Sequence, residues 1–151
     1  MLSARSDTAH RPSRPVRVHA TRGSLRAVAI GGGTGLPTVL QGLRTVCGPD
    51  VDEHRAHDWL TAVVTVMDDG GSSGRLRESL GVLPPGDIRN CLAALVRQPS
   101  SLSGILNDRM AGENGEAGHP IGNLLLAALT TTEGDLLRAV ARLGHQIGIT
   151  G

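Results

Sequence analysis

Two glycine-rich segments contain the residue types that could hold a phosphate group. The first directly precedes an apolar helical pattern, and its residues are Gly31, Gly32, Gly33, Thr34 and Gly35. Glycine lets the backbone approach a phosphate closely, and a helix N-terminus offers unpaired N–H groups to an anion. No Gly-Lys-Ser/Thr follows, which excludes a P-loop, and the spacing matches Gly-x-Gly-x-x-Gly imperfectly. We expect these residues to face a nucleotide or phosphate; the alternative is a structural turn.

The second glycine-rich segment adds side chains that could bind a ligand. Its residues are Asp68, Asp69, Gly70, Gly71, Ser72, Ser73, Gly74 and Arg75. A carboxylate at a strand end can hold a ribose hydroxyl or a Mg²⁺ ion, and serine hydroxyls with glycine N–H groups can cradle a phosphate. Arg75 or Arg77 would supply the positive charge. The alternative is a turn in which an aspartate caps the next helix.

Two further segments could contribute polar groups. Asp87, Arg89 and Asn90 lie at the start of a predicted helix, where they form either an anion site or an N-cap beside a solvent-facing arginine. His119 lies in a loop between a glycine and a proline, with Asn123 one helical turn further on. These two either contact a ligand or satisfy local backbone groups. The other histidines show no metal-ligand spacing, and we name no catalytic residue.

The elements that position these residues begin with a strand–helix–strand unit. The apolar run 25–30 predicts a buried strand, and the β-branched run 60–67 predicts a second one. Between them the apolar face of a helix is formed by Leu36, Val39, Leu40, Leu43 and Val46. Such a unit gives a parallel sheet. Because ligands bind beyond the carboxyl ends of parallel strands, both glycine-rich segments are expected to lie there side by side.

Further helices are predicted along the rest of the chain. A short helix is expected at 75–80, and a Pro-Pro-Gly sequence at 84–86 then interrupts the chain. Asp87 is predicted to be the N-cap of the next helix. Another amphipathic helix is expected over 135–147, with His145 exposed to solvent.

Composition excludes several classes of function. Trp59 is the only aromatic residue, which argues against stacking platforms for single-stranded nucleic acid. All fifteen basic residues are arginine, which excludes a lysine Schiff base. No run approaches the roughly 18 apolar residues of a membrane span. Cys47 and Cys91 fall within helical patterns without CxxC spacing, which indicates buried thiols in a reducing compartment.

Charge is distributed unevenly and separates a basic tail from an acidic remainder. Residues 1–26 hold six arginines and one aspartate, whereas the rest of the chain has nine arginines and thirteen acidic residues. Prolines and the lack of an apolar run predict that residues 1–24 form a disordered tail without the apolar core of a signal peptide. A solvated tail is favoured over a nucleic-acid arm because the remainder, 25–151, is acidic.

Four motifs in a fixed order resemble one protein family. They read AIGGGTGLP at 29–37, DDGGSSGRLR at 68–77, PPGDIRN at 84–90 and GHPIGNLLLAAL at 118–129. Together they resemble the gluconeogenesis-factor family, YvcK, within the superfamily that includes the 2-phospho-L-lactate transferase CofD. The continuation of the second motif after the paired aspartates resembles the gluconeogenesis-factor branch.

The resemblance implies an α/β fold with a Rossmann-like parallel sheet and helices on both faces. It implies a cytoplasmic, non-catalytic regulator that binds UDP-N-acetylglucosamine and is required for growth on gluconeogenic carbon sources and for normal cell shape. A cell-wall precursor enzyme and a second copy of the chain are the implied partners. The transferase branch would instead move a phospholactyl group from a guanylyl-activated donor to a deazaflavin, with Mg²⁺ on Asp68 or Asp69.

Two departures from the family pattern shape our expectations. The connector 50–58 is longer than is usual in the family, and we interpret it as a surface insertion. The chain is also shorter than family members, so we expect it to be the amino-terminal part of a larger domain, with an open hydrophobic sheet edge. The choice between a uridine and a guanosine ligand would then depend on the part that is absent.

Overall fold

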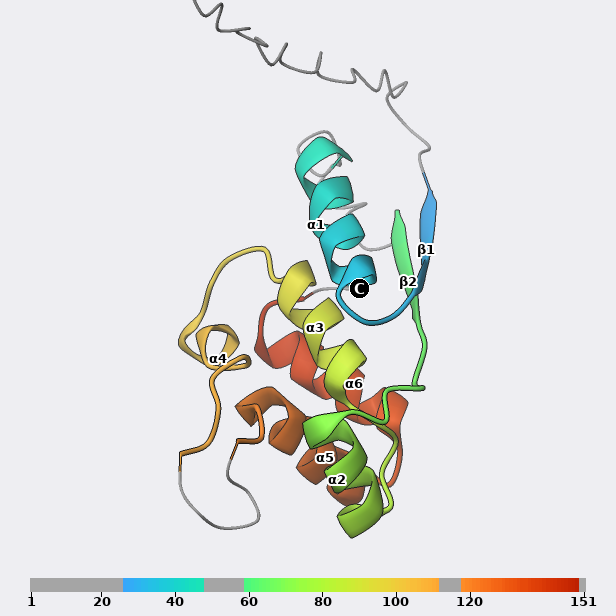
Figure 1. The fold of residues 1–151 in the computed structure, drawn as a ribbon. Helices are drawn as coiled ribbons and strands as arrows, with labels where there is room; N and C mark the ends of the chain where they lie inside the picture. Colours follow the sequence, from blue (N-terminus) through green and yellow to red (C-terminus); the bar gives the residue numbers. More distant parts are fainter. Residues whose placement is uncertain (1–25, 48–58, 112–117, 150–151) are drawn as a thin grey trace, which may run out of the picture.

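The computed structural model describes residues 26–47, 59–111 and 118–149. The predicted disordered tail at 1–24 and the predicted insertion at 50–58 lie outside the described residues. Within them the chain is an α/β structure in which a strand–helix–strand unit is followed by a group of helices (Figure 1). The α/β class predicted from the sequence is confirmed.

The first unit forms a parallel two-stranded sheet. Strand β1 spans Ala27–Gly31, helix α1 spans Gly35–Cys47 and strand β2 spans Leu60–Val64. The register pairs Ala29 with Ala62 and Gly31 with Val64. Thr65 N–H donates to the Gly31 carbonyl at 2.8 Å, so β2 stops pairing where β1 ends. The predicted second strand, 60–67, is therefore too long by three residues.

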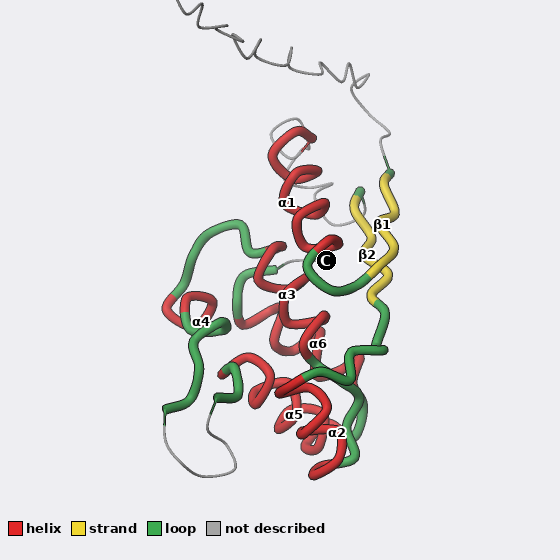
Figure 2. The backbone as a smooth tube through the Cα atoms, viewed as in Figure 1, coloured by secondary structure: helices red, strands yellow, loops and turns green. Residues whose placement is uncertain are grey.

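The remaining elements in the described residues are helices (Figure 2). Their bounds are Gly71–Leu80 for α2, Gly86–Leu95 for α3, Ser101–Gly104 for α4, Ile121–Glu133 for α5 and Leu136–Gln146 for α6. Asp135 caps α6, because its side chain accepts a hydrogen bond from the Arg138 N–H. His145 is exposed, as predicted. No helix in this part of the chain has the length and apolar character needed to cross a membrane.

Helices cover one face of the sheet in the described residues. Ala29 is buried beneath Leu36 and Leu40 of α1 and Cys91 of α3, in a cluster that also packs against Ala62 of β2. The opposite face is exposed: Val28 and Ile30 of β1 show 63% and 73% of their surface to solvent. Helices on both faces were expected, and the second layer is not found among the described elements. This bare face agrees with the expectation of an incomplete sheet.

A second core joins α3 to the last two helices. Ile88 and Leu92 of α3 pack with Leu126 of α5 and Leu143 of α6, and Leu106 closes the cluster. Because α3 contributes to both cores, it links the sheet unit to the helical group. Asp87, at the N-terminal end of α3, lies against Gly32, which directly follows β1.

Two predictions about these helices are wrong in detail. The helix predicted at 75–80 begins at Gly71, so Gly71–Gly74 form its first turn and not a loop. Asp87 is not an N-cap: Pro85 occupies that position and Asp87 is the second residue of α3. Asp87 is also buried, with 7% of its surface exposed, because its carboxylate packs against the first glycine segment.

Candidate functional site

The first glycine segment and the start of α3 are packed against each other. A Cβ built on Gly32 would lie 2.2 Å from Thr65 Oγ1 and 2.5 Å from Asp87 Oδ2. Only glycine leaves room for this contact, because real Cβ atoms are not found so close to an oxygen. Gly32 thus brings the Asp87 carboxylate to the carboxyl ends of β1 and β2, the position at which ligands bind in parallel sheets.

The second glycine segment meets α3 from another direction. The Gly86 N–H donates to Ser73 Oγ at 3.2 Å. A Cβ on Gly86 would lie 2.5 Å from that oxygen and 2.7 Å from Asp68 Oδ2. Ser73 is buried, with 2% of its surface exposed. Asp68 is therefore held close to the N-terminal turn of α3, which also carries Asp87.

A buried polar network ties the second segment to the fourth motif. Ser72 Oγ lies 2.6 Å from His119 Nδ1, and Asn123 Nδ2 donates to the same oxygen at 3.0 Å. Since the amide donates to the hydroxyl oxygen, the hydroxyl proton is available to the histidine nitrogen. His119 and Asn123 are 3% and 2% exposed. The network anchors α2 to α5 across the site.

The two adjacent aspartates point to different partners. Asp68 is half-buried, and its Oδ1 accepts a hydrogen bond from the Gly70 N–H at 2.9 Å. Asp69 is exposed and forms an ion pair with Arg77. No group of three metal-ligating His, Cys, Asp or Glu side chains occurs among the described residues. Asp68 is thus the member of the pair that faces the site, and Asp69 is not.

Arg89 is held by neutral partners and by the fourth motif. Its Nη1 donates to Asn107 Oδ1 and its Nη2 to Asn90 Oδ1, both at 2.7 Å. Its stem passes Gly122, where a Cβ would lie 2.8 Å from Arg89 Cγ. Burial lowers the pKa of the Arg89 guanidinium, the nearby Arg109 lowers it further, and Asp68 opposes both effects. The predicted alternative of a solvent-facing arginine is wrong.

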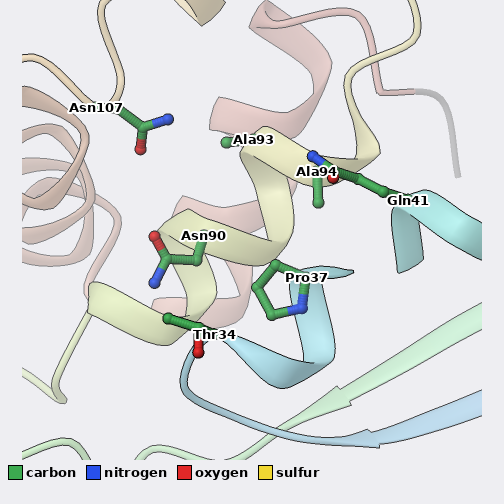
Figure 3. Close-up of a pocket in the computed structure, with 7 residues that line it drawn as sticks. All are labelled: Thr34, Pro37, Gln41, Asn90, Ala93, Ala94 and Asn107. Atoms are coloured by element: carbon green, nitrogen blue, oxygen red, sulfur yellow. The ribbon is translucent and has the colours of Figure 1, made fainter. Parts of the chain in front are cut away.

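A pocket of about 260 Å³ opens between α1 and α3 (Figure 3). It is lined by Thr34, Pro37, Gln41, Asn90, Ala93, Ala94 and Asn107. Thr34 comes from the first glycine segment and Asn90 from α3, so two predicted site segments contribute to one space. Gln41 and Asn107 have no signal in the motifs, and the tertiary structure alone brings them here.

The predicted residues thus divide into three groups. The first consists of residues packed together at the strand ends: Gly31, Gly32, Asp68, Ser72, Ser73, Asp87, His119 and Asn123. The second consists of Thr34 and Asn90, which line the pocket, and Arg89, which donates a hydrogen bond to Asn90. Gly33, Gly35, Asp69, Gly70, Gly71 and Arg75 are exposed at the margin. The Gly74 N–H donates to the Gly70 carbonyl at 3.3 Å, so it is not free for a phosphate.

Cys91 is a structural thiol beneath the site. It is 3% exposed and is not in a disulfide. Burial raises the pKa of the Cys91 thiol to about 11, and the charge of Asp87 adds to the shift. A thiol with such a pKa is almost fully protonated at neutral pH, so it does not act as a nucleophile. The prediction of a buried thiol is confirmed for Cys91.

Comparison with known proteins identifies similar chains. A family model described as 2-phospho-L-lactate transferase CofD matches residues 27–151. A putative gluconeogenesis factor from Nostoc is 48% identical over 126 residues, which cover 83% of this chain and 25% of that protein. The gluconeogenesis factor of Bacillus subtilis is 45% identical over 121 residues, which cover 80% of this chain and 35% of that protein.

A solved structure supports the same relationship. A crystal structure of a Bacillus halodurans protein superposes with a TM-score of 0.71 at 42% identity, covering 85% of this chain and 38% of that one. The chain thus spans about a quarter to a third of the length of the two curated relatives above. At 42% identity the likeness extends to sequence as well as fold.

Proposed function

The chain belongs to the CofD family, and from that premise we propose that it acts as a gluconeogenesis factor that binds a sugar nucleotide beyond the carboxyl ends of β1 and β2. UDP-N-acetylglucosamine is the proposed ligand. The proposed role is regulatory and cytoplasmic: ligand binding would adjust the supply of cell-wall precursors during growth on gluconeogenic carbon sources, and so support normal cell shape.

The observation that carries the proposal is the convergence of four distant segments at one place. Gly32 packs on Asp87, Ser73 bonds to the Gly86 N–H, and Ser72 contacts His119. Each contact joins segments that are separated in the sequence, and each uses a residue of a family motif. Such convergence at the ends of parallel strands is typical of a binding site.

The chemistry of this place suits a nucleotide sugar. The first turns of α1 and α3 present N–H groups that have no partner within their own helix, which favours a phosphate. Asp68 and Asp87 offer carboxylate oxygens that can accept hydrogen bonds from ribose or sugar hydroxyls. Cys91 is protonated and buried, and Ser72 is held in a network that joins two helices. These features favour binding over covalent catalysis.

A thermal-shift series tests the proposal. The chain, and a version extended through the downstream reading frame, are heated with UDP-N-acetylglucosamine, with GDP and Mg²⁺, or with NAD. A ligand present at 100 times its dissociation constant stabilises the folded state by about 2.7 kcal/mol. We expect a shift with the UDP-sugar, which Asp87→Asn should reduce and the exposed matched variant Glu78→Gln should retain. Absence of any shift with the UDP-sugar contradicts the proposal.

The description of the family model supports a second candidate function. We propose as the alternative a phospholactyl transferase acting on a deazaflavin with a guanylyl-activated donor. Asp68 is the carboxylate that fits a Mg²⁺ ion, which takes one or two carboxylates together with phosphate oxygens; Asp69 is paired with Arg77. The ion would stabilise charge on the transferred phosphoryl group. Transfer of phospholactate to the deazaflavin, lost in Asp68→Asn, would favour this alternative.

A protein partner is the third element of the proposal. We propose that the ligand-bound chain contacts an enzyme of cell-wall precursor synthesis or a second copy of itself. Asp69→Ala changes an exposed margin residue, whereas Asp68→Ala changes the site. If partner capture is lost in a variant that still binds the nucleotide, the surface and the ligand site have separate roles.

A further inference from the structure

We propose that Arg44 is a positioning residue of the ligand site: it fixes α3 along α1 and thereby keeps Asp87 against Gly32. Arg44 lies in the last turn of α1, outside the four sequence motifs. Its Nη1 donates hydrogen bonds to the Ala94 carbonyl at 2.6 Å and to the Val96 carbonyl at 2.7 Å. The inference rests on the proposed function, because it concerns the same site.

The C-terminal end of α3 needs hydrogen-bond donors that α3 itself does not supply. The last four carbonyl groups of a helix have no partner within that helix. Helix α2 ends at Gly81 in the left-handed region, with φ of +64°, and the Gly81 N–H donates to the Arg77 carbonyl at 2.9 Å. Helix α3 is instead followed by Val96, with φ of −59° and ψ of 121°. Arg44 therefore does for α3 what the glycine cap does for α2.

The charge of Arg44 strengthens this contact. The C-terminal end of a helix carries a partial negative charge, which favours a cation there. Burial lowers the pKa of the Arg44 guanidinium, and the nearby Arg97 lowers it further, so the cation is partly removed from water. Hydrogen bonds to two carbonyl oxygens compensate for the lost hydration. A neutral side chain of similar length without donors cannot replace this contact.

Arg44 also supplies the directional contact between α1 and α3. Leu40 of α1 packs with Cys91 and Ala94 of α3 through apolar surfaces, and such packing has no preferred direction. Among the described residues, no hydrogen bond other than those of Arg44 joins α1 to the end of α3 or to any other part of it. The apolar contact alone therefore leaves the position of α3 along α1 less well defined.

The effect reaches Asp87 because a helix is stiff. Asp87 and Ala94 lie near opposite ends of α3, about 10 Å apart along the helix at 1.5 Å per residue. A Cβ built on Gly32 would lie 2.5 Å from Asp87 Oδ2, so the contact between these two residues tolerates little movement of α3. Arg44 at one end and Gly32 at the other thus hold α3 in a single position, and Arg44 affects the site without touching a ligand.

The variants Arg44→Met and Arg44→Lys separate the hydrogen bonds from the bulk of the side chain. Methionine keeps an unbranched chain but has no donor. Lysine keeps the donors, because both bonds leave from one nitrogen and an ammonium group has three N–H groups. Arg142→Met is the matched control: Arg142 of α6 is paired with Glu133 of α5, so it joins two helices outside the site.

Nuclear magnetic resonance without ligand tests the positioning directly. In the unchanged chain we expect a nuclear Overhauser contact between the Gly32 Hα and Asp87 Hβ protons. Arg44→Lys and Arg142→Met should retain this contact, and Arg44→Met should lose it. If Arg44→Met does not fold, Arg44→Gln is measured in its place, with the same expectation. Full retention of the contact in the folded variant without the arginine overturns the proposal.

Titration with UDP-N-acetylglucosamine measures the consequence for binding. Arg44→Met should raise the dissociation constant at least about fivefold, the size expected when a variant disturbs a contact that couples two elements. Arg44→Lys and Arg142→Met should stay within about twofold of the unchanged chain. Urea unfolding gives the folded fraction of each variant, and a chain that is almost fully folded does not lose affinity through reduced stability alone.

Two results of this titration overturn the proposal: equal affinity in Arg44→Met, and a loss in Arg44→Lys as large as in Arg44→Met. If the unchanged chain does not bind the UDP-sugar, the proposed function fails. The contact between Gly32 and Asp87, measured without ligand, still decides whether Arg44 positions α3.

Discussion

The two glycine-rich segments have similar composition, but their last residues have different surroundings. In the first, an added Cβ at Gly33 or Gly35 would meet no atom within 4 Å. In the second, an added Cβ at Gly74 would lie 2.5 Å from the Asp69 carbonyl oxygen. Ser73, next to Gly74, is buried and accepts a hydrogen bond from α3. The end of the first segment, at Gly33 and Gly35, is therefore open, and its packed residue is Gly32. The end of the second segment, at Ser73 and Gly74, is packed.

This difference teaches that glycine serves two purposes within one site. Gly33 lies in the left-handed region, with φ of +59°, which shapes an exposed turn before α1. Gly74 is inside α2, where its missing side chain lets the helix approach the backbone of Asp69. Substitutions should consequently affect stability in the second segment and ligand binding in the first.

Gly74→Ala should have the largest effect on stability. Its Cβ would overlap a backbone carbonyl that cannot rotate away, so we expect a loss of about 3 kcal/mol in the free energy of unfolding. Gly35→Ala is the matched change in the open segment and should alter stability by less than about 0.5 kcal/mol. Urea unfolding measures both, and similar losses in the two variants would contradict the comparison.

Ser72→Ala should have the next largest effect. It removes the hydroxyl that Asn123 and His119 share, leaving the buried amide donor of Asn123 without this acceptor. We expect a loss of about 2 kcal/mol. Thr34→Ala, at an exposed hydroxyl, should change stability by less than about 0.5 kcal/mol while it weakens binding of UDP-N-acetylglucosamine. Calorimetry of unfolding and of binding separates the two results.

Gly33→Ala should have a smaller effect that comes from the backbone alone. The site has room for a methyl group, but its positive φ costs an L-residue about 1 kcal/mol. Gly33→Asn should recover part of this loss, because asparagine tolerates the left-handed region better than alanine. If both variants are as stable as the original chain in urea, the turn does not hold the conformation described here.

The Cys91 thiol provides a pH-dependent test of the packed region. Its folded pKa is raised to about 11 from an ordinary 9.0, so the folded state holds the proton more tightly than the unfolded state does. This contribution to stability is complete below pH 9 and is lost as the pH rises towards 11. Iodoacetamide alkylation at pH 8, followed by peptide mass spectrometry, should be about a hundredfold slower at Cys91 than at a free thiol.

The variant Asp87→Asn tests how much the charge of Asp87 contributes to the raised pKa of Cys91. The Asp87 charge is the second cause of the raised pKa of Cys91, after burial. Removing the charge should move the pH profile of alkylation downwards, although burial keeps the pKa above its ordinary value. An unchanged pH profile would show that the charge of Asp87 does not contribute to the raised pKa of Cys91.

The parts of the fold that could be predicted are those that depend on residues close together in the sequence. The periodicity of α1 and the β-branched run of β2 are local signals, and both elements were predicted. The start of α2 was not, because glycine and serine have low helix propensity and Gly71–Gly74 depend on contacts with Asp69 and Gly86. Likewise, β2 ends at Val64 because its partner strand ends at Gly31.

The sequence could predict which segments form the site, but it could not predict how their side chains are arranged in space. The motifs correctly pointed to Asp87 and Arg89, yet the sequence could not show that Asp87 is buried against Gly32 or that Arg89 contacts Asn107. These contacts join residues far apart in the chain, and no local pattern encodes them. Gln41 and Asn107 were missed for the same reason.

Hydrogen–deuterium exchange with and without UDP-N-acetylglucosamine tests the central claim most directly. If the four segments form one ligand site, saturating UDP-sugar should slow exchange at residues 32–36 and 86–90, with a smaller change at 71–74, which is already packed. Exchange in α6 should stay the same. Protection confined to α6, or no protection at all at saturating ligand, would contradict a sugar-nucleotide site at the carboxyl ends of β1 and β2.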